Sequence, residues 1–194
     1  VERKQNSNIE TGLQLARATA NYPEGSRFKW NVEVLWCVEN YLRAATPAQR
    51  AAFVEAVKSG QIGLDAFYCN ILAGLSRPEE LLQLMRYATQ LSAEWGVPIE
   101  SAMISDVPGY TWSLVSAMAQ AGVKYFSFAP NYFDRMGGTI QEWQNRPFWW
   151  KGPDGRSRVL CWCPSRGYAL GHIIGDGEAL ARFIPGYLVE LGTN

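Results

Sequence analysis

The sequence predicts an α/β fold, in which a mostly parallel sheet of β/α units forms part of a seven- or eight-stranded α/β barrel. Three segments repeat one plan: an amphipathic helix, a glycine and then a short apolar strand. About five parallel strands can be recognised in the 194 residues, whereas a closed barrel typically takes eight strands and roughly 250 residues. The chain also begins at Val1 rather than methionine. We therefore expect residues 1–194 to be a single, partial barrel domain, with an open α/β sheet as the alternative.

Composition narrows the class of protein. Hydrophobic residues make up 47% of the chain, which is enough to bury a core and argues against disorder. The 18 Lys and Arg residues balance 18 Asp and Glu residues, so no basic surface for nucleic acid is expected. No apolar run approaches the roughly 18 residues that a membrane span requires. We expect neither a nucleic-acid partner nor a membrane partner.

The first part of the chain reads as helix, strand, helix and strand. An amphipathic helix is expected near residues 8–20, and the β-branched and aromatic run Phe28–Trp36 predicts a strand. Thr46 as N-cap and Gln49 three residues later form a capping box, which starts the next helix. The apolar run Ile62–Tyr68 predicts the strand that follows it.

Two further units follow the same plan. Ser76 and Glu79 predict a capping box at the start of a helix that ends before Gly96. The strand of this unit is expected at residues 99–105. A third helix, around residues 114–119, leads to a strand at residues 123–129.

The end of the chain predicts a hairpin and a helix. Phe148–Trp150 faces the β-branched run Arg158–Cys163 across the turn KGPDGR. Cys161 and Cys163 alternate along this second strand and should be packed thiols on one face, because the four cysteines include no CxxC pair. An amphipathic helix is expected from Gly177 to Phe183.

Chemistry in α/β folds gathers at the carboxyl ends of the parallel strands. Polar residues that follow predicted strands are Asn70, Asp106, Asn131, Tyr132, Asp134, Ser165, Arg166 and Tyr168. Asp106 is the strongest candidate, because the constrained Pro108-Gly109 loop holds it at a strand end, where it could act as nucleophile, base or metal ligand. Alternatively, Asp106 hydrogen-bonds to its own loop. Glu33, in the first strand, suits a site role or a salt bridge equally well.

A single histidine, His172, stands beside eight tryptophans. A lone histidine is more often structural than catalytic. The chain contains no HExxH, GxSxG or P-loop motif and no GxGxxG that opens a helix. With one histidine and no cysteine cluster, it cannot complete a typical zinc site by itself.

Several segments together resemble one enzyme family. FKWNVEVLW, SGQIGL, RPEELLQLMRYATQL and MISDVPGYTWSLVSAMAQAGVKYF follow one another in the order found in the N-terminal catalytic domain of glycoside hydrolase family 38, the α-mannosidases. The later FWWKGPDGRSRVLCWCPSRGY resembles the tryptophan-rich stretch of that family and the strand after it. The resemblance covers most of residues 27–170 and is most specific over residues 103–126.

The resemblance implies a function and a site. It implies a retaining glycosidase for α-mannosides or related glycosides, in which Asp106 is both the nucleophile and a zinc ligand. A retaining mechanism also needs a second carboxylic acid about 5 Å away as acid/base, for which Asp134 and Asp176 are the hypotheses. The implied zinc would bind substrate hydroxyls rather than generate hydroxide. We expect Asn131, Tyr132 and Tyr168 to bind the substrate.

The chain departs from the family at four points, one of which is that His172 does not lie in a motif that matches the family's later zinc histidine. The family's first strand carries a His-x-Asp zinc pair, and this sequence begins after that point. The loop after Asp106 reads VPGYTW in place of Phe-Gly-His-Ser, and Pro130-Asn131 stands where the family has an arginine. The isolated segment should therefore bind zinc poorly and be inactive. Its expected partners are an oligosaccharide or glycoside, the remainder of the same polypeptide and, as a possibility, further copies of itself.

Three other functions remain open on the sequence. The first is a carbohydrate-binding barrel that has kept its aromatic rings but has no catalytic activity. The second is an enzyme similar to the polysaccharide deacetylases, although these need an Asp-Asp pair and two histidines along a helix. The third is a structural α/β domain whose aromatic residues are core.

Overall fold

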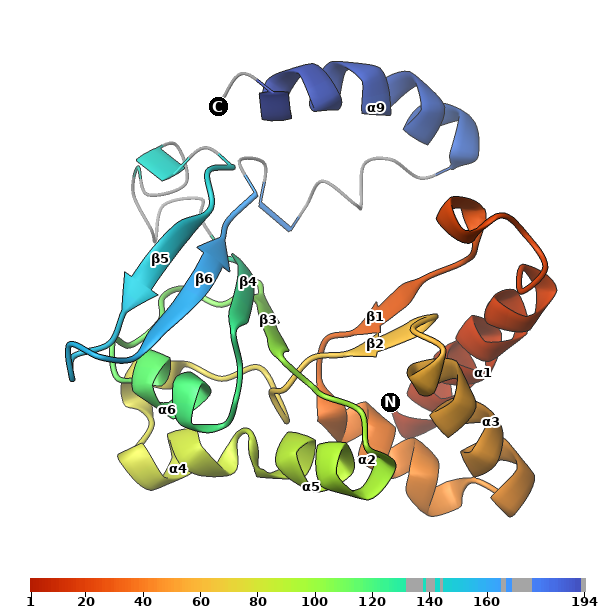
Figure 1. The fold of residues 1–194 in the computed structure, drawn as a ribbon, viewed down its shortest axis with the longest axis horizontal. Helices are drawn as coiled ribbons and strands as arrows, with labels where there is room; N and C mark the ends of the chain where they lie inside the picture. The colour runs from red at the N-terminus through yellow and green to blue at the C-terminus, as the bar shows by residue number, and fades with distance from the viewer. Residues whose placement is uncertain (132–137, 139–141, 144, 165–166, 169–175, 193–194) are drawn as a thin grey trace. The chain divides into compact units, whose positions relative to one another are not determined.

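The computed structural model describes residues 1–131, 138, 142–143, 145–164, 167–168 and 176–192 (Figure 1). The chain forms two compact units. Unit 1 comprises Val1–Cys69, Leu82–Met103 and Ala121–Val123, and unit 2 comprises Asn70–Leu81, Ile104–Gln120 and Lys124–Asn194. Helices and mostly parallel strands alternate, which confirms the predicted α/β class. The described strands form two small sheets that do not close, so the predicted partial barrel is not confirmed. The assignment of residues 1–194 to a single domain stays a prediction.

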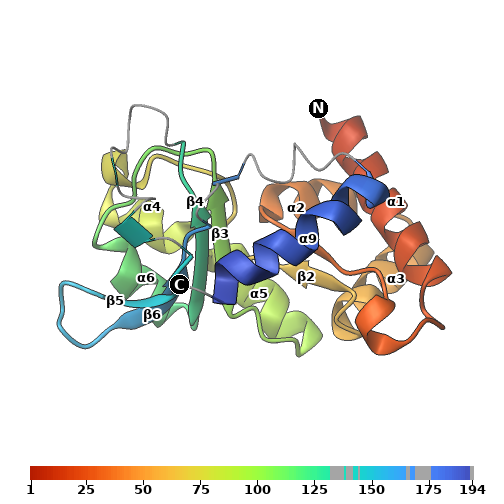
Figure 2. The same cartoon turned by 90° about the horizontal axis from the view of Figure 1, so that it is seen from above.

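Unit 1 is built on two parallel strands and the helices packed against them. Strands β1 (Trp30–Val32) and β2 (Ile62–Leu64) pair in parallel. Helices α1 (Glu2–Ala18), α2 (Leu35–Ala44) and α3 (Pro47–Lys58) lie side by side (Figures 1 and 2). Phe53 of α3 is fully buried between the rings of Tyr41 and Trp95. This packing forms the aromatic core of the unit.

The strand predicted at residues 28–36 is wrong in its second half. β1 ends at Val32, and Leu35 already begins α2. The buried side chains Leu35, Val38 and Leu42 recur at helical spacing, so burial along one face of a helix overrides the β-propensity of this segment. The strand predicted at residues 62–68 is likewise shorter, because β2 ends at Leu64.

The helix starts are partly as predicted. The capping box of α3 is confirmed, since Thr46 and Gln49 satisfy each other's backbone N–H groups. The predicted Ser76–Glu79 box is wrong by one residue: the Arg77 N–H donates to Glu80 Oε2 at 2.6 Å. The helix that follows is also interrupted, as α4 (Pro78–Gln83) ends before α5 (Arg86–Trp95) begins. Two short 3-10 helices, η1 (Glu24–Ser26) and η2 (Ala73–Leu75), complete this half of the chain.

The second sheet has the order β3-β4-β6-β5. Its strands are β3 (Ser101–Ser105), β4 (Tyr125–Ala129), β5 (Phe148–Lys151) and β6 (Arg158–Trp162). β4 and β6 are parallel, and β5 returns antiparallel to β6, which confirms the predicted hairpin (Figure 1). Helix α6 (Leu114–Gln120) packs against β6. Cys161 and Cys163 are buried free thiols, as predicted.

Helix α9 (Gly177–Gly192) is longer than predicted and has no buried residue. Asp176 caps it, because its Oδ1 accepts the Ala179 N–H at 2.7 Å. None of the described helices is long and apolar enough to cross a membrane.

Candidate functional site

Asp106 lies at the carboxyl end of β3, where the backbone turns sharply. Its φ is 59°, in the left-handed region that residues other than glycine seldom adopt. The Asp106 N–H donates to the carbonyl oxygen of Ala129, the last residue of β4, at 2.9 Å. This bond ties the residue to the carboxyl end of the neighbouring strand. Such unusual backbone positions cluster at functional sites, because the surrounding structure must hold them in place.

The Asp106 side chain is exposed and held from one side. Asn131, just beyond β4, donates from Nδ2 to Asp106 Oδ1 at 2.7 Å. Of the described residues, only Asn131 hydrogen-bonds to this carboxylate, so the expected alternative of capping its own loop is not observed in this part of the chain. One oxygen is thus oriented by an amide, and the side chain as a whole is exposed, so that a reacting group could reach the carboxylate.

The loop after Asp106 is anchored by an aromatic ring. Tyr110 packs edge-on against Phe126 and Phe128 of β4, with ring centroids 5.6 and 5.0 Å apart. Gly109 has a φ of 99°, which the turn requires and which other residues rarely adopt. The neighbouring strand therefore fixes the position of the loop that begins at Asp106.

A largely apolar hollow of about 480 Å³ opens beside this loop. Its lining residues are Leu72, Gly74, Leu75, Pro108, Gly109, Tyr110 and Thr111. Leu75 is 82% exposed. The Asn70 amide, which precedes this lining, donates to the carbonyl oxygen of Ser105 at 3.5 Å. Unit 2 thus brings Asn70, Asp106 and Asn131 to one edge of its sheet.

Unit 1 holds a second carboxyl group at a strand end that the sequence analysis did not single out. Asp65 directly follows β2 and is 2% exposed. Its carboxyl accepts hydrogen bonds from Asn31 and Ser101, and its backbone N–H donates to Val32. Burial raises the pKa of Asp65 to about 6, against the opposing effect of these hydrogen bonds and with a small contribution from the charge of Glu33. A polar residue immediately after the apolar run IGL was the available signal.

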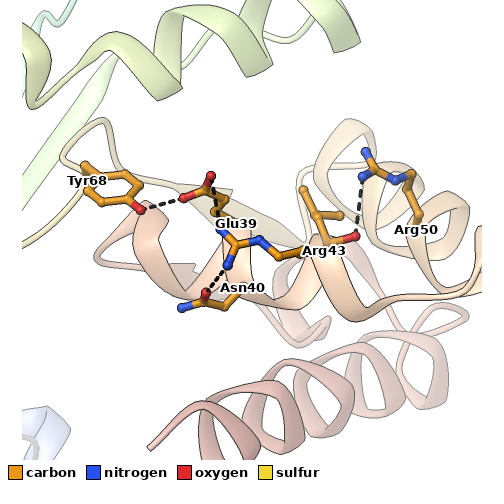
Figure 3. A network of polar contacts seen from close by, with 6 residues as sticks. Glu39, Asn40, Arg43, Arg50 and Tyr68 are labelled. Atoms are coloured by element: carbon orange, nitrogen blue, oxygen red, sulfur yellow. Dashed lines mark hydrogen bonds and ion pairs between the residues drawn. The ribbon is translucent and has the colours of Figure 1, made fainter.

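A polar network connects helix α2 to Tyr68, which lies in the segment after β2 (Figure 3). The Tyr68 hydroxyl donates to Glu39 Oε2 at 2.5 Å, and Arg43 pairs with Glu39 Oε1 at 3.4 Å. The hydrogen bond to Glu39 is the main reason that the pKa of Tyr68 rises to about 12, with burial second. A phenol with this pKa stays protonated at neutral pH. We assign the network a structural role, because it joins α2 to the segment after β2.

Several predicted residues gain no further support. Tyr132, Asp134, Ser165, Arg166 and His172 lie outside the described residues. Tyr168 lies half-buried in a turn, Glu33 lies in a bend after β1, and the Asp176 carboxylate caps α9. The roles of Asn131, Tyr132 and Tyr168 in substrate binding stay predictions.

Metal ligands are not assembled in the part of the chain that the structure describes. No group of three or more His, Cys, Asp or Glu side chains there could hold a metal ion. Burial raises the pKa of the Cys161 and Cys163 thiols to about 12 and about 11. Both thiols are therefore protonated at neutral pH in this structure.

A comparison with models of protein families gives a match over almost the whole chain. A family model described as the N-terminal domain of glycosyl hydrolases family 38 matches residues 1–187. No curated protein matches the chain in sequence.

Solved structures share the fold. An alpha-mannosidase from Enterococcus faecalis V583 has a TM-score of 0.72 at 21% identity, over 97% of this chain and 20% of that protein. A family 38 glycosyl hydrolase from Enterococcus faecalis has a TM-score of 0.67 at 19% identity, over 99% and 20%. A 4-alpha-glucanotransferase from Thermococcus litoralis has a TM-score of 0.64 at 14% identity, over 89% and 26%. The chain thus spans about a fifth to a quarter of the length of these proteins.

Proposed function

The chain belongs to glycosyl hydrolase family 38, and we propose that it supplies the nucleophile Asp106 to a retaining glycosidase that acts on α-mannosides or related glycosides. The position of Asp106 carries this proposal: an exposed carboxylate at the carboxyl ends of β3 and β4, in a left-handed backbone conformation, with one oxygen held by Asn131. The glycoside hydrolase family itself is established by the match, whereas the substrate, the stereochemistry and the role of Asp106 are proposals.

The proposed reaction uses Asp106 in two steps. In the first, the Asp106 oxygen that Asn131 does not contact attacks the anomeric carbon, the glycosidic C–O bond breaks, and a second carboxylic acid protonates the departing oxygen. In the second, water attacks the anomeric carbon of the covalent intermediate and gives its proton to that same group, which releases Asp106 as a carboxylate. Asn131 acts by keeping the Asp106 carboxylate in one orientation throughout.

The acid/base residue is not assigned. Asp134 stays a hypothesis outside the described residues. The Asp176 carboxylate already accepts the Ala179 N–H at the start of α9, and this capping role accounts for its position. We therefore propose no catalytic role for Asp176.

Zinc binding at this site is likewise part of the proposal. Asp106 would be one ligand, and the ion would bind substrate hydroxyls when present. The described residues do not by themselves fit a complete zinc site, because no cluster of three ligating side chains occurs among them. No step above passes through the ion.

Azide rescue tests the proposed role of Asp106 in the intact polypeptide. Asp106→Gly should abolish cleavage of an aryl α-mannoside, and added azide should restore it by forming the β-mannosyl azide, with inverted configuration. Glu79→Gln, which changes an exposed carboxylate on α4, is the control and should retain full activity. Wild-type turnover by Asp106→Gly would refute the nucleophile role. A folded, inactive wild type that binds mannosides would favour the non-catalytic carbohydrate-binding alternative.

A further inference from the structure

The outer face of β4, β6 and β5 carries a row of aromatic side chains. Residues directly opposite each other on paired strands point to the same side of a sheet. Tyr125 pairs with Leu160, and Leu160 pairs with Trp149, so these three side chains form one row across three strands. With strands about 4.8 Å apart, the ends of the row lie roughly 10 Å from each other. That span is comparable to two sugar rings.

The rings of this row are exposed, unlike those on the other side of the sheet. Tyr125 is 51% and Trp149 is 53% exposed. On the inner face, by contrast, Phe126 stacks on Phe128 and Trp150, with centroids 5.2 and 6.4 Å apart. The inner face therefore supplies the core of the sheet, and the outer row is not needed for it.

Two cations lie beside this row on the same face. Arg158 and Lys151 are opposite one another, two positions along their strands from Leu160 and Trp149. The Arg158 guanidinium lies over the Trp149 ring, 4.5 Å from its centroid. This cation–π contact holds the guanidinium plane in place and leaves its N–H groups available to an anion. On the other side of the row, Trp162 pairs by position with Ser127, and its indole N–H donates to the Asn145 carbonyl oxygen at 3.1 Å.

The residues on the outer face, taken from the paired positions of the three strands, are Tyr125, Ser127, Trp149, Lys151, Arg158, Leu160 and Trp162. None of these carries a negative charge. Aromatic rings suit the apolar faces of pyranoses, and an ordered guanidinium binds carboxylates, sulfates or phosphates through paired hydrogen bonds. A neutral ligand would leave the two cations unmatched.

We propose that this outer face is a carbohydrate-binding surface for an acidic oligosaccharide, whose rings stack on Tyr125 and Trp149 and whose anionic groups pair with Arg158 and Lys151. Asp106 is not among the residues of this surface, and the proposed binding does not depend on the proposed hydrolysis.

Calorimetric titration of the 194-residue chain measures this binding without any turnover. The probes are mannuronate oligosaccharides, neutral mannose oligosaccharides of equal length and inorganic polyphosphate. Mannuronate should bind at least tenfold more tightly than either other probe, because only it offers both rings and carboxylates. Equal affinity for the neutral sugar would overturn the role of the cations, equal affinity for polyphosphate would overturn the stacking, and no binding of mannuronate would overturn the whole proposal.

Variants locate the surface. Trp149→Ala and Arg158→Gln should each weaken mannuronate binding about tenfold, which corresponds to about 1.4 kcal/mol. Tyr22→Ala is the control, because Tyr22 is 52% exposed, like Tyr125, but lies in unit 1; it should leave the affinity unchanged. An equal loss in Tyr22→Ala would overturn the location. If Trp149→Ala instead converts a dimer to a monomer in light scattering and no sugar binds, the face is an interface between copies.

Discussion

Replacing Asp65 with asparagine should stabilise unit 1 at neutral pH and flatten its pH dependence. The folded protein raises the pKa of this carboxyl from 3.8 to about 6, chiefly through burial. The folded state thus binds more protons than the unfolded state between these two values. The contribution of Asp65 to stability is therefore fully present below pH 3.8 and is lost as the pH rises through 6.

The magnitude follows from the shift. A rise in pKa of about two units, at 1.36 kcal/mol for each, amounts to a cost of about 3 kcal/mol once Asp65 is fully ionised. At pH 7.5 the cost is close to this limit, and at pH 4.5 the same linkage relation gives about 1 kcal/mol. Asparagine stays neutral and can still accept from Asn31 and donate to the Ser101 hydroxyl. The stability of Asp65→Asn relative to wild type should thus rise by about 2 kcal/mol between pH 4.5 and pH 7.5.

Urea unfolding followed by tryptophan fluorescence measures this difference. Urea unfolding curves of the wild type and the variant are recorded at pH 4.5 and at pH 7.5. The contributions of other titrating groups cancel when the two proteins are compared at the same pH. With m of about 2 kcal/mol per molar urea, the relative midpoint should shift by about 1 M. A wild-type minus variant difference that is constant with pH, or that changes in the opposite direction, would refute the argument that burial dominates at Asp65.

Three further changes test other parts of the structure. Thr46→Ala removes the side-chain acceptor of the α3 capping box and should lower the free energy of unfolding by about 1 kcal/mol, measured by urea unfolding. Gly63→Ala should be destabilising because a Cβ there would overlap the Asn31 side chain, and its cost should be smaller when Asn31 has already been replaced by alanine; additive effects in this double-mutant cycle would contradict the contact. Hydrogen bonds from the Ser157 side chain and from the backbone lower the pKa of Asp154 to about 2. The ionised Asp154 carboxylate should therefore stabilise the hairpin turn at neutral pH. This contribution should be lost as the pH falls towards 2, and Asp154→Asn should remove that acid dependence in thermal melts.

Local signals predicted the parts of the fold that depend on a few neighbouring residues. The Thr46 capping box and the β5–β6 hairpin rest on such signals, and both are observed. The start of α2 was missed because Leu35 and Trp36 continue the aromatic and β-branched run that begins at Phe28, whereas the helical spacing of Leu35, Val38 and Leu42 extends beyond that run. The interruption between α4 and α5 lies inside a continuous helical pattern, where the spacing of apolar residues gives no warning.

The candidate site illustrates the same limit more sharply. Asp106 follows a predicted strand, whereas Asp65 lies inside the strand predicted at residues 62–68 and comes to a strand end only because β2 stops at Leu64. The fold distinguishes the two residues. Asp65 is buried, and burial raises its pKa because it disfavours the charged carboxylate. Asp106 is exposed and is oriented by the Asn131 amide. A nucleophilic carboxylate must be ionised and reachable by the anomeric carbon. Accessibility therefore favours Asp106, and Asp65 is better suited to joining the ends of β1, β2 and β3 through Asn31, Val32 and Ser101.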